Sequence, residues 1–90
     1  MEFEDTVTIR NRLGLHARPA CRFAQKASEF DATVLLVKDG KKVDGKNILD
    51  VLTLACPHGS VLTVKAIGPD ADQAVADLKT LVENRFGELD

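Results

Sequence analysis

Four strand-like runs alternate with three helix-like segments along this chain of 90 residues, and this order limits the folds that the chain can adopt. Residues 6–10 alternate polar and apolar side chains, as in a strand with one buried face. Residues 33–37 form a strongly apolar strand, and Asp39-Gly40 predicts a type I′ hairpin turn into a short return strand over 41–43. The last strand is expected over residues 60–67.

Apolar residues at helical spacing predict the three helices. The first helix follows His16 and should end near Glu29; its buried face is formed by Ala20, Phe23, Ala24 and Ala27. The second is short and begins after Asn47, a residue type that caps helix N-termini well. Its apolar positions are Ile48, Leu49, Leu52 and Ala55.

The third helix begins at Asp70, which with Gln73 three residues later resembles a capping box. Its long apolar stripe comprises Ala71, Ala74, Val75, Leu78, Leu81, Val82 and Phe86. Three helices with one apolar stripe each can cover one face of a four-stranded, mainly antiparallel sheet. The sequence therefore predicts a two-layer α+β domain with the order β-α-β-β-α-β-α, spanning residues 1–90 as a single domain.

Charge is unevenly distributed along a chain whose net charge is −2. Residues 6–28 carry no acid, and their basic residues are Arg10, Arg12, Arg18, Arg22 and Lys26. Acids dominate from residue 69 onwards. The chain contains no apolar run approaching the roughly 18 residues of a membrane span, and its acidic start does not resemble a signal peptide. We expect a cytoplasmic protein without membrane insertion, in which Cys21 and Cys56 are free thiols.

The segment Gly14-Leu15-His16-Ala17-Arg18-Pro19-Ala20 carries the chemistry. If His16 is the N-cap, the first backbone amides of the helix have no internal acceptor and favour an anion. Pro19 is tolerated there because it has no N–H. Arg18 adds a planar cation suited to phosphate oxygens, and the backbone amide of Ala17 lies beside the imidazole. The pattern favours a phosphohistidine at His16, whereas the simpler reading makes His16 only a polar helix cap.

Metal binding is not expected. Cys21, Cys56 and His58 are possible zinc ligands, but their spacing matches no paired metal motif. Nucleic-acid binding by a sheet of similar topology would require aromatic residues on the strands, and the chain has no Trp or Tyr. A further alternative is an interaction domain in which His16 has no chemical role.

The motif around His16 resembles the active-site sequence of the histidine-containing phosphocarrier proteins (HPr) of the bacterial sugar phosphotransferase system. The resemblance continues through Val43-Asp44-Gly45-Lys46-Asn47-Ile48-Leu49 and Leu52-Thr53-Leu54. It implies an open-faced β-sandwich with sheet order 1-4-2-3. It also implies a phosphocarrier, not an enzyme in its own right, that needs no cofactor and that we expect to be monomeric.

The resemblance further implies that His16 accepts a phosphoryl group on Nδ1 from phosphorylated enzyme I, which is charged by phosphoenolpyruvate. His16 then passes the group to an enzyme II A protein, with Arg18 steadying it. The implied partner-binding residues are Ile48, Leu49, Leu52, Lys46 and Arg12. Asn47 stands where many members carry a regulatory serine, so control by phosphorylation there should be absent. Asp50 adds a negative charge that bears on partner choice. A nitrogen-related or other regulatory branch is the alternative role.

Overall fold

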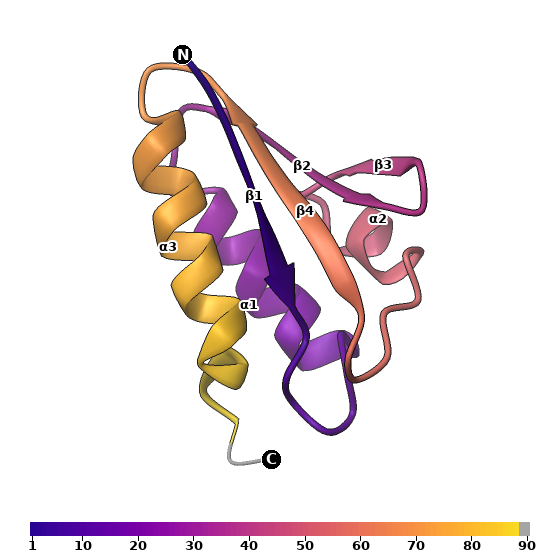
Figure 1. The fold of residues 1–90 in the computed structure, drawn as a ribbon. Coiled ribbons are helices and arrows are strands. Elements are labelled where there is room, and N and C mark those ends of the chain that lie inside the picture. The colour runs from indigo at the N-terminus through magenta and orange to yellow at the C-terminus, as the bar shows by residue number, and fades with distance from the viewer. Residues whose placement is uncertain (89–90) are drawn as a thin grey trace.

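The computed structural model describes residues 1–88 and has the predicted order of elements. Figure 1 shows a sheet with helices α1 and α3 packed along one face and the shorter α2 beside β3. The elements are β1 (Glu2–Thr8), α1 (Ala17–Ala27), β2 (Thr33–Lys38), β3 (Lys41–Asp44), α2 (Ile48–Leu52), β4 (Val61–Ile67), α3 (Ala71–Glu83) and a final 3₁₀ turn η1 (Arg85–Gly87). No helix within these residues is long and apolar enough to cross a membrane.

The sheet has the order β1-β4-β2-β3 with every neighbouring pair antiparallel, which confirms the fold class. Leu36 of β2 lies opposite Val43 of β3 and Val64 of β4. The β2–β3 connection is the expected hairpin, since Asp39 (φ 50°) and Gly40 (φ 83°) both have the left-handed backbone that a type I′ turn requires. β3 is the last strand in the sheet order and so lies at an edge, where its exposed lysines discourage pairing with another chain.

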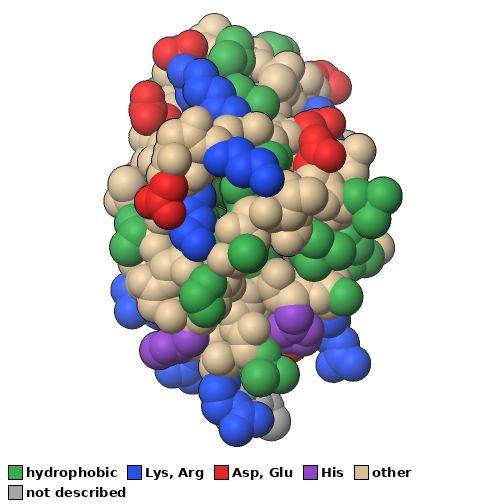
Figure 2. Space-filling view, turned by 90° about the vertical axis from the view of Figure 1, so that its right-hand side faces the viewer, with side chains coloured by type: hydrophobic (Ala, Val, Ile, Leu, Met, Phe, Trp, Pro, Cys, Tyr) green, Lys and Arg blue, Asp and Glu red, His purple; other side chains and the backbone are tan. Residues whose placement is uncertain are grey.

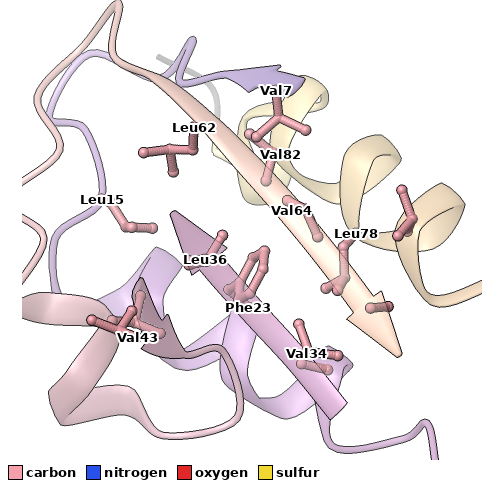
Figure 3. Close-up of a cluster of buried hydrophobic side chains, with 14 of the residues drawn as sticks. Val7, Leu15, Phe23, Val34, Leu36, Val43, Leu62, Val64, Leu78 and Val82 are labelled. Carbon is pink, nitrogen blue, oxygen red and sulfur yellow. The ribbon is translucent and has the colours of Figure 1, made fainter. Parts of the chain in front are cut away.

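The core lies between the sheet and the helices. Figure 3 shows Phe23 of α1 among strand residues such as Val34 and Leu36, with Leu78 and Val82 of α3 beside Val64. Phe23, Leu36 and Leu78 are at most 1% exposed. The buried positions of α1 include the expected set, Ala20, Phe23, Ala24 and Ala27. This core fixes the position of α1, and with it the loop before its N-terminus that carries His16.

The first strand differs from the prediction. It runs over Glu2–Thr8 instead of residues 6–10, because the acidic start of the chain pairs with β4 in a continuous register. Charged residues at 2, 4 and 5 are acceptable there because β1 is an edge strand whose side chains are largely exposed. Tertiary pairing thus overrides the weak strand signal of these residues.

Helix details also required correction. Helix α1 ends at Ala27, two residues before Glu29, where the Ser28 hydroxyl donates to the Ala24 carbonyl. The buried residue of α2 is Val51, which the predicted apolar set omitted, while Ala55 lies beyond the helix end with φ 50°.

The predicted capping box at α3 is wrong. Asp70 is the N-cap residue of α3, but its side chain makes no cap hydrogen bond; its carboxylate accepts from the amides of Asp31 and Ala32. The Gln73 side chain donates to Asp77 instead. Phe86 is buried as expected, but it belongs to η1 and not to α3.

Candidate functional site

The loop before α1 lies directly against the loop that follows α2. Gly14 has φ +71°, and a Cβ at this position would overlap the carbonyl oxygen of Cys56. The next amide, that of Leu15, donates to the same carbonyl at 2.8 Å. Glycine is needed here for both its left-handed backbone and this close approach. This contact fixes the backbone immediately before His16, and with it the point at which α1 begins.

His16 is the N-cap of α1, as predicted, with extended backbone angles (φ −82°, ψ −170°). Its side chain makes no cap hydrogen bond, and its carbonyl accepts from Ala20 at 2.9 Å. Within residues 1–88, no acceptor is bonded to the amides of Ala17 and Arg18, and Pro19 has no N–H. The first turn also contains no acid. This end of the helix therefore offers two outward amides to an anion beside the imidazole.

Arg18 is exposed on the first turn of α1, and no hydrogen bond or ion pair joins its guanidinium to another described residue. The Arg12 side chain is exposed in the loop before His16. Figure 2 shows histidine side chains at the surface near one end of the molecule, with Lys and Arg side chains around them and hydrophobic ones nearby. The basic residues on either side of His16 in the sequence predict this surrounding, which suits a phosphoryl group.

The ring of His16 has a partner that the sequence analysis missed. Its Nε2 lies 3.2 Å from Oε2 of Glu88, and the side chains are 36% and 18% exposed. The other carboxylate oxygen of Glu88 accepts at 2.9 Å from Nδ2 of Asn11, which also donates to the Gly14 carbonyl at 2.6 Å. Asn11 is fully buried, and its Oδ1 has no hydrogen-bond partner among residues 1–88. An unpartnered buried acceptor costs about 1–3 kcal/mol, so this amide is kept at some expense in stability.

Helix α2, which packs against α1, carries Ile48, Leu49 and Leu52 of the predicted partner-binding residues. Leu49 is 71% exposed, while Ile48 and Leu52 are half-buried against the core. Lys46 is half-buried and its ammonium donates to the Phe30 carbonyl at 2.7 Å, so part of its hydrogen-bonding capacity is used within the fold. Leu49 is thus the most protruding apolar side chain of this set.

The N-terminus of α2 is closed by its own cap. Asn47 Oδ1 accepts from the amides of Leu49 (3.0 Å) and Asp50 (3.2 Å). Asn47 therefore supplies a cap without a hydroxyl, as the sequence indicated. Asp50 lies in the first turn, where a negative charge is favourable for the helix.

The two cysteines are free thiols among the described residues. Burial raises the pKa of the Cys56 thiol, so this group is a poor nucleophile at neutral pH. His58 is exposed in the loop that follows. Over residues 1–88, no group of three or more His, Cys, Asp or Glu side chains is arranged to hold a metal ion.

The family model described as "PTS HPr component phosphorylation site" matches residues 3–84. The chain belongs to the HPr family. It is 43% identical over 81 residues to phosphocarrier protein HPr of Cupriavidus necator, covering 90% of this chain and 91% of that protein. It is 41% identical over 87 residues to phosphocarrier protein NPr of Shewanella violacea, covering 97% and 96%.

Solved HPr structures share the fold. A crystal structure of HPr from Thermoanaerobacter tengcongensis has a TM-score of 0.92 and 42% identity, with 96% of this chain and 97% of that chain covered. An HPr dimer from the same organism also matches. The family model names the PTS HPr component and the two relatives are named phosphocarrier proteins, so the resemblance to the HPr family drawn from the motif around His16 is confirmed.

Proposed function

We propose that this chain is a cytoplasmic, monomeric phosphocarrier that accepts a phosphoryl group from phosphorylated enzyme I at His16 and passes it to an enzyme II A protein for sugar uptake. The observation that supports this most directly is the half-exposed ring of His16 beside two open amides at the start of α1. Accepting the group forms an N–P bond at His16 while the donor's bond to phosphorus breaks. The electron pair of the broken bond stays with the donor.

The roles of the neighbouring groups follow from the charge on the transferred group. Phosphoryl transfer depends mainly on positioning and on stabilising charge spread over the phosphoryl oxygens. The amides of Ala17 and Arg18 and the guanidinium of Arg18 supply donors for those oxygens. No separate catalytic base is needed in the carrier, because the imidazole nitrogen that attacks carries a lone pair.

The partner surface is proposed to consist of Ile48, Leu49 and Leu52 with Lys46 and Arg12 at its rim. A carrier that visits two partners needs a small interface that it can leave quickly. The exposed Leu49 beside half-buried neighbours fits such an interface. Leu49→Asp is expected to weaken binding to both partners while leaving the thermal unfolding midpoint nearly unchanged, because this side chain contributes little to the core.

A phosphotransfer assay tests the proposal. With enzyme I and ³²P-labelled phosphoenolpyruvate, the wild type is expected to take up label, and His16→Ala is expected to take up none. The label should survive mild base and be lost in acid, as expected of a phosphorus–nitrogen bond. Equal labelling of wild type and variant would refute His16 as the acceptor, and acid-stable label would indicate a serine or threonine ester.

A second candidate function is the nitrogen-related branch, in which the phosphorylation state signals to regulators. The similarity to an NPr over 97% of the chain favours it. Labelling rates with the enzyme I of the sugar system and with that of the nitrogen-related system discriminate between the two roles. In either role, Asn47 cannot be phosphorylated as a serine can, so an HPr kinase with ATP should leave α2 unlabelled.

A further inference from the structure

The carboxylate of Glu88 connects the imidazole of His16 to the buried interior. One oxygen lies 3.2 Å from His16 Nε2, and the other accepts from Asn11 Nδ2 at 2.9 Å. The three residues come from the loop before α1 and from the segment after η1, more than 70 positions apart in the chain. A contact between such distant segments requires that both be held in place.

The segment that carries Glu88 contains strained backbone, which packing and hydrogen bonds hold in place. Arg85 (φ 60°) and Phe86 (φ 55°) are consecutive non-glycine residues in the left-handed region, which ordinary side chains rarely adopt. Phe86 is 1% exposed, its carbonyl accepts from the Arg22 side chain, and the Glu88 amide donates to the Arg85 carbonyl at 2.8 Å. Such strain persists where the surroundings over-determine it, and it is frequent at functional sites.

Asn11 fixes the carboxylate from the other side. Both groups that its side chain contacts, the Gly14 carbonyl and Glu88 Oε1, are acceptors, so the amide must direct its NH₂ group towards them. Its Oδ1 is buried, and no group in the described part of the chain donates to it. The amide therefore serves its two donor contacts and leaves its own acceptor unsatisfied. One of those contacts supports the loop of His16, and the other holds the carboxylate that faces the ring.

We propose that Glu88 is a positioning residue for phosphoryl transfer, held by Asn11 and by the turn at residues 85–86. This role rests on the proposed function of His16. The Glu88 carboxylate keeps the imidazole proton on Nε2 and leaves the lone pair of Nδ1 free to attack. This tautomer is the one a carboxylate acceptor at Nε2 selects.

The same contact stabilises the product of the transfer. When Nδ1 of the neutral ring forms its bond to phosphorus and the donor's bond breaks, the ring keeps its Nε2 proton and becomes cationic. The leaving electron pair stays with the donor, so no further reactant is required. The Nε2–H···Glu88 contact then becomes a charge-assisted hydrogen bond, which is stronger than its neutral counterpart. Glu88 is thus expected to raise the equilibrium share of phosphorylated protein.

The test compares wild type with Glu88→Gln and Glu88→Ala, and uses Glu29→Gln as the matched control. Glu29 is an exposed acid past the opposite end of α1. Glutamine keeps the size of Glu88 but replaces one carboxylate oxygen by an NH₂ group and removes the charge. Two quantities are measured, the ¹⁵N chemical shifts of the neutral ring and the phosphorylated fraction at equilibrium with phosphorylated enzyme I.

In the wild type and in Glu29→Gln, Nε2 should give the shift of a protonated nitrogen and Nδ1 that of an unprotonated one. In Glu88→Ala the two shifts should move towards each other as the tautomers mix. The equilibrium constant for accepting the phosphoryl group should fall roughly three- to tenfold in both Glu88 variants, by the difference between charged and neutral hydrogen bonds. A merely structural role of Glu88 would not move the tautomer signal in a folded variant.

Two failures can be told apart. If the wild type takes no label, the proposed function of His16 fails, whatever the ring spectrum shows. If the wild type is labelled and the Glu88 variants match Glu29→Gln in both ring shifts and equilibrium, the role assigned to Glu88 is overturned. The ring spectrum is recorded without any partner protein, so it tests the tautomer independently of phosphotransfer.

Discussion

The N-termini of α1 and α2 are built from the same backbone groups but are used in opposite ways. At α2 the side chain of Asn47 accepts from the amides of Leu49 and Asp50, so the end of the helix is satisfied by the protein itself. At α1 the cap is His16, which makes no such bond and leaves the amides of Ala17 and Arg18 open. A short side chain with an oxygen closes a helix end, whereas an imidazole with its ring held elsewhere leaves it available to a ligand.

The difference shows that the cap residue's side chain decides whether the amides of a helix end stay open to an anion, as we propose for α1. The ring of His16 is occupied with Glu88, so it does not fold back onto its own helix. The two helices pack against each other, and the N-terminus of one is closed while that of the other is open. Substitutions that cap the open N-terminus of α1 or uncap the N-terminus of α2 test this difference.

His16→Asn should produce the largest effect, because it gives α1 the kind of cap that α2 has. Labelling by enzyme I and phosphoenolpyruvate should be lost completely, since no acceptor nitrogen remains. The free energy of unfolding, measured with urea, should rise by up to about 1 kcal/mol as the new side chain caps the helix. Retention of label would place the phosphoryl acceptor elsewhere in the chain.

Arg18→Ala should remove a donor at the open end and keep the fold. We expect the rate of phosphoryl acceptance to fall roughly 10- to 100-fold, since a charge-assisted hydrogen bond contributes about 1.5–3 kcal/mol. Rapid-quench measurement of labelling provides the rate. Arg18→Lys keeps the charge and loses the planar fork, so its rate of phosphoryl acceptance should lie between those of the wild type and Arg18→Ala. An unchanged rate in the alanine variant would remove Arg18 from the site.

Asn47→Ala should affect the closed end in the reverse sense. Loss of the two cap bonds should lower the free energy of unfolding by about 1 kcal/mol, while His16 remains competent to take label. Urea unfolding monitored by circular dichroism measures the first effect, and the labelling assay the second. Asn47→Asp, which retains a capping oxygen, is the control and should unfold nearly as the wild type does. If Asn47→Ala is still folded under the assay conditions but takes up label more slowly than the wild type, Asn47 contributes to partner binding.

The third helix extends the comparison, because its N-cap residue, Asp70, makes no cap hydrogen bond with its side chain. Hydrogen bonds from the amides of Asp31 and then Ala32 hold the pKa of Asp70 below its ordinary value of 3.8. The unfolded chain therefore binds this proton more readily than the folded one does. The stabilisation is present above that ordinary value and is lost as the pH falls through the folded-state pKa.

Asp70→Asn should accordingly destabilise the protein slightly at neutral pH, and its difference from the wild type should shrink in acid. Thermal unfolding of both proteins across the acid range measures this. A difference that stays constant with pH would show that the carboxylate charge of Asp70 does not contribute.

Much of the fold could be predicted because the local signals agree with one another. The apolar face of α1, the Asp39-Gly40 turn and the site at His16 are each written in a few adjacent residues. The start of β1 could not be found in this way, because acidic residues become strand only by pairing with β4. The sequence predicted a side-chain cap from Asp70, but the carboxylate accepts hydrogen bonds from the amides of Asp31 and Ala32 in a distant loop.

The missed part of the candidate site has the same origin. Asn11 reads as an ordinary loop residue, and Glu88 as one acid among many near the end of the chain. Their significance arises only when η1 brings residue 88 back to residue 16. No local pattern encodes a contact across that separation. The left-handed pair Arg85 and Phe86 gives no sequence signal either, since neither is a residue type associated with that backbone.

The closeness of Glu88 to His16 also has a practical consequence for how this protein is handled. The two ends of the described chain lie at opposite ends of the molecule, as Figure 1 shows, and the later one leads into the site. An affinity tag or fluorescent reporter fused to the C-terminus would follow Glu88 by two residues, and Glu88 lies 3.2 Å from the His16 ring at which we propose that enzyme I docks. The same label attached ahead of Met1 would lie at the remote end of the sheet and leave that approach clear.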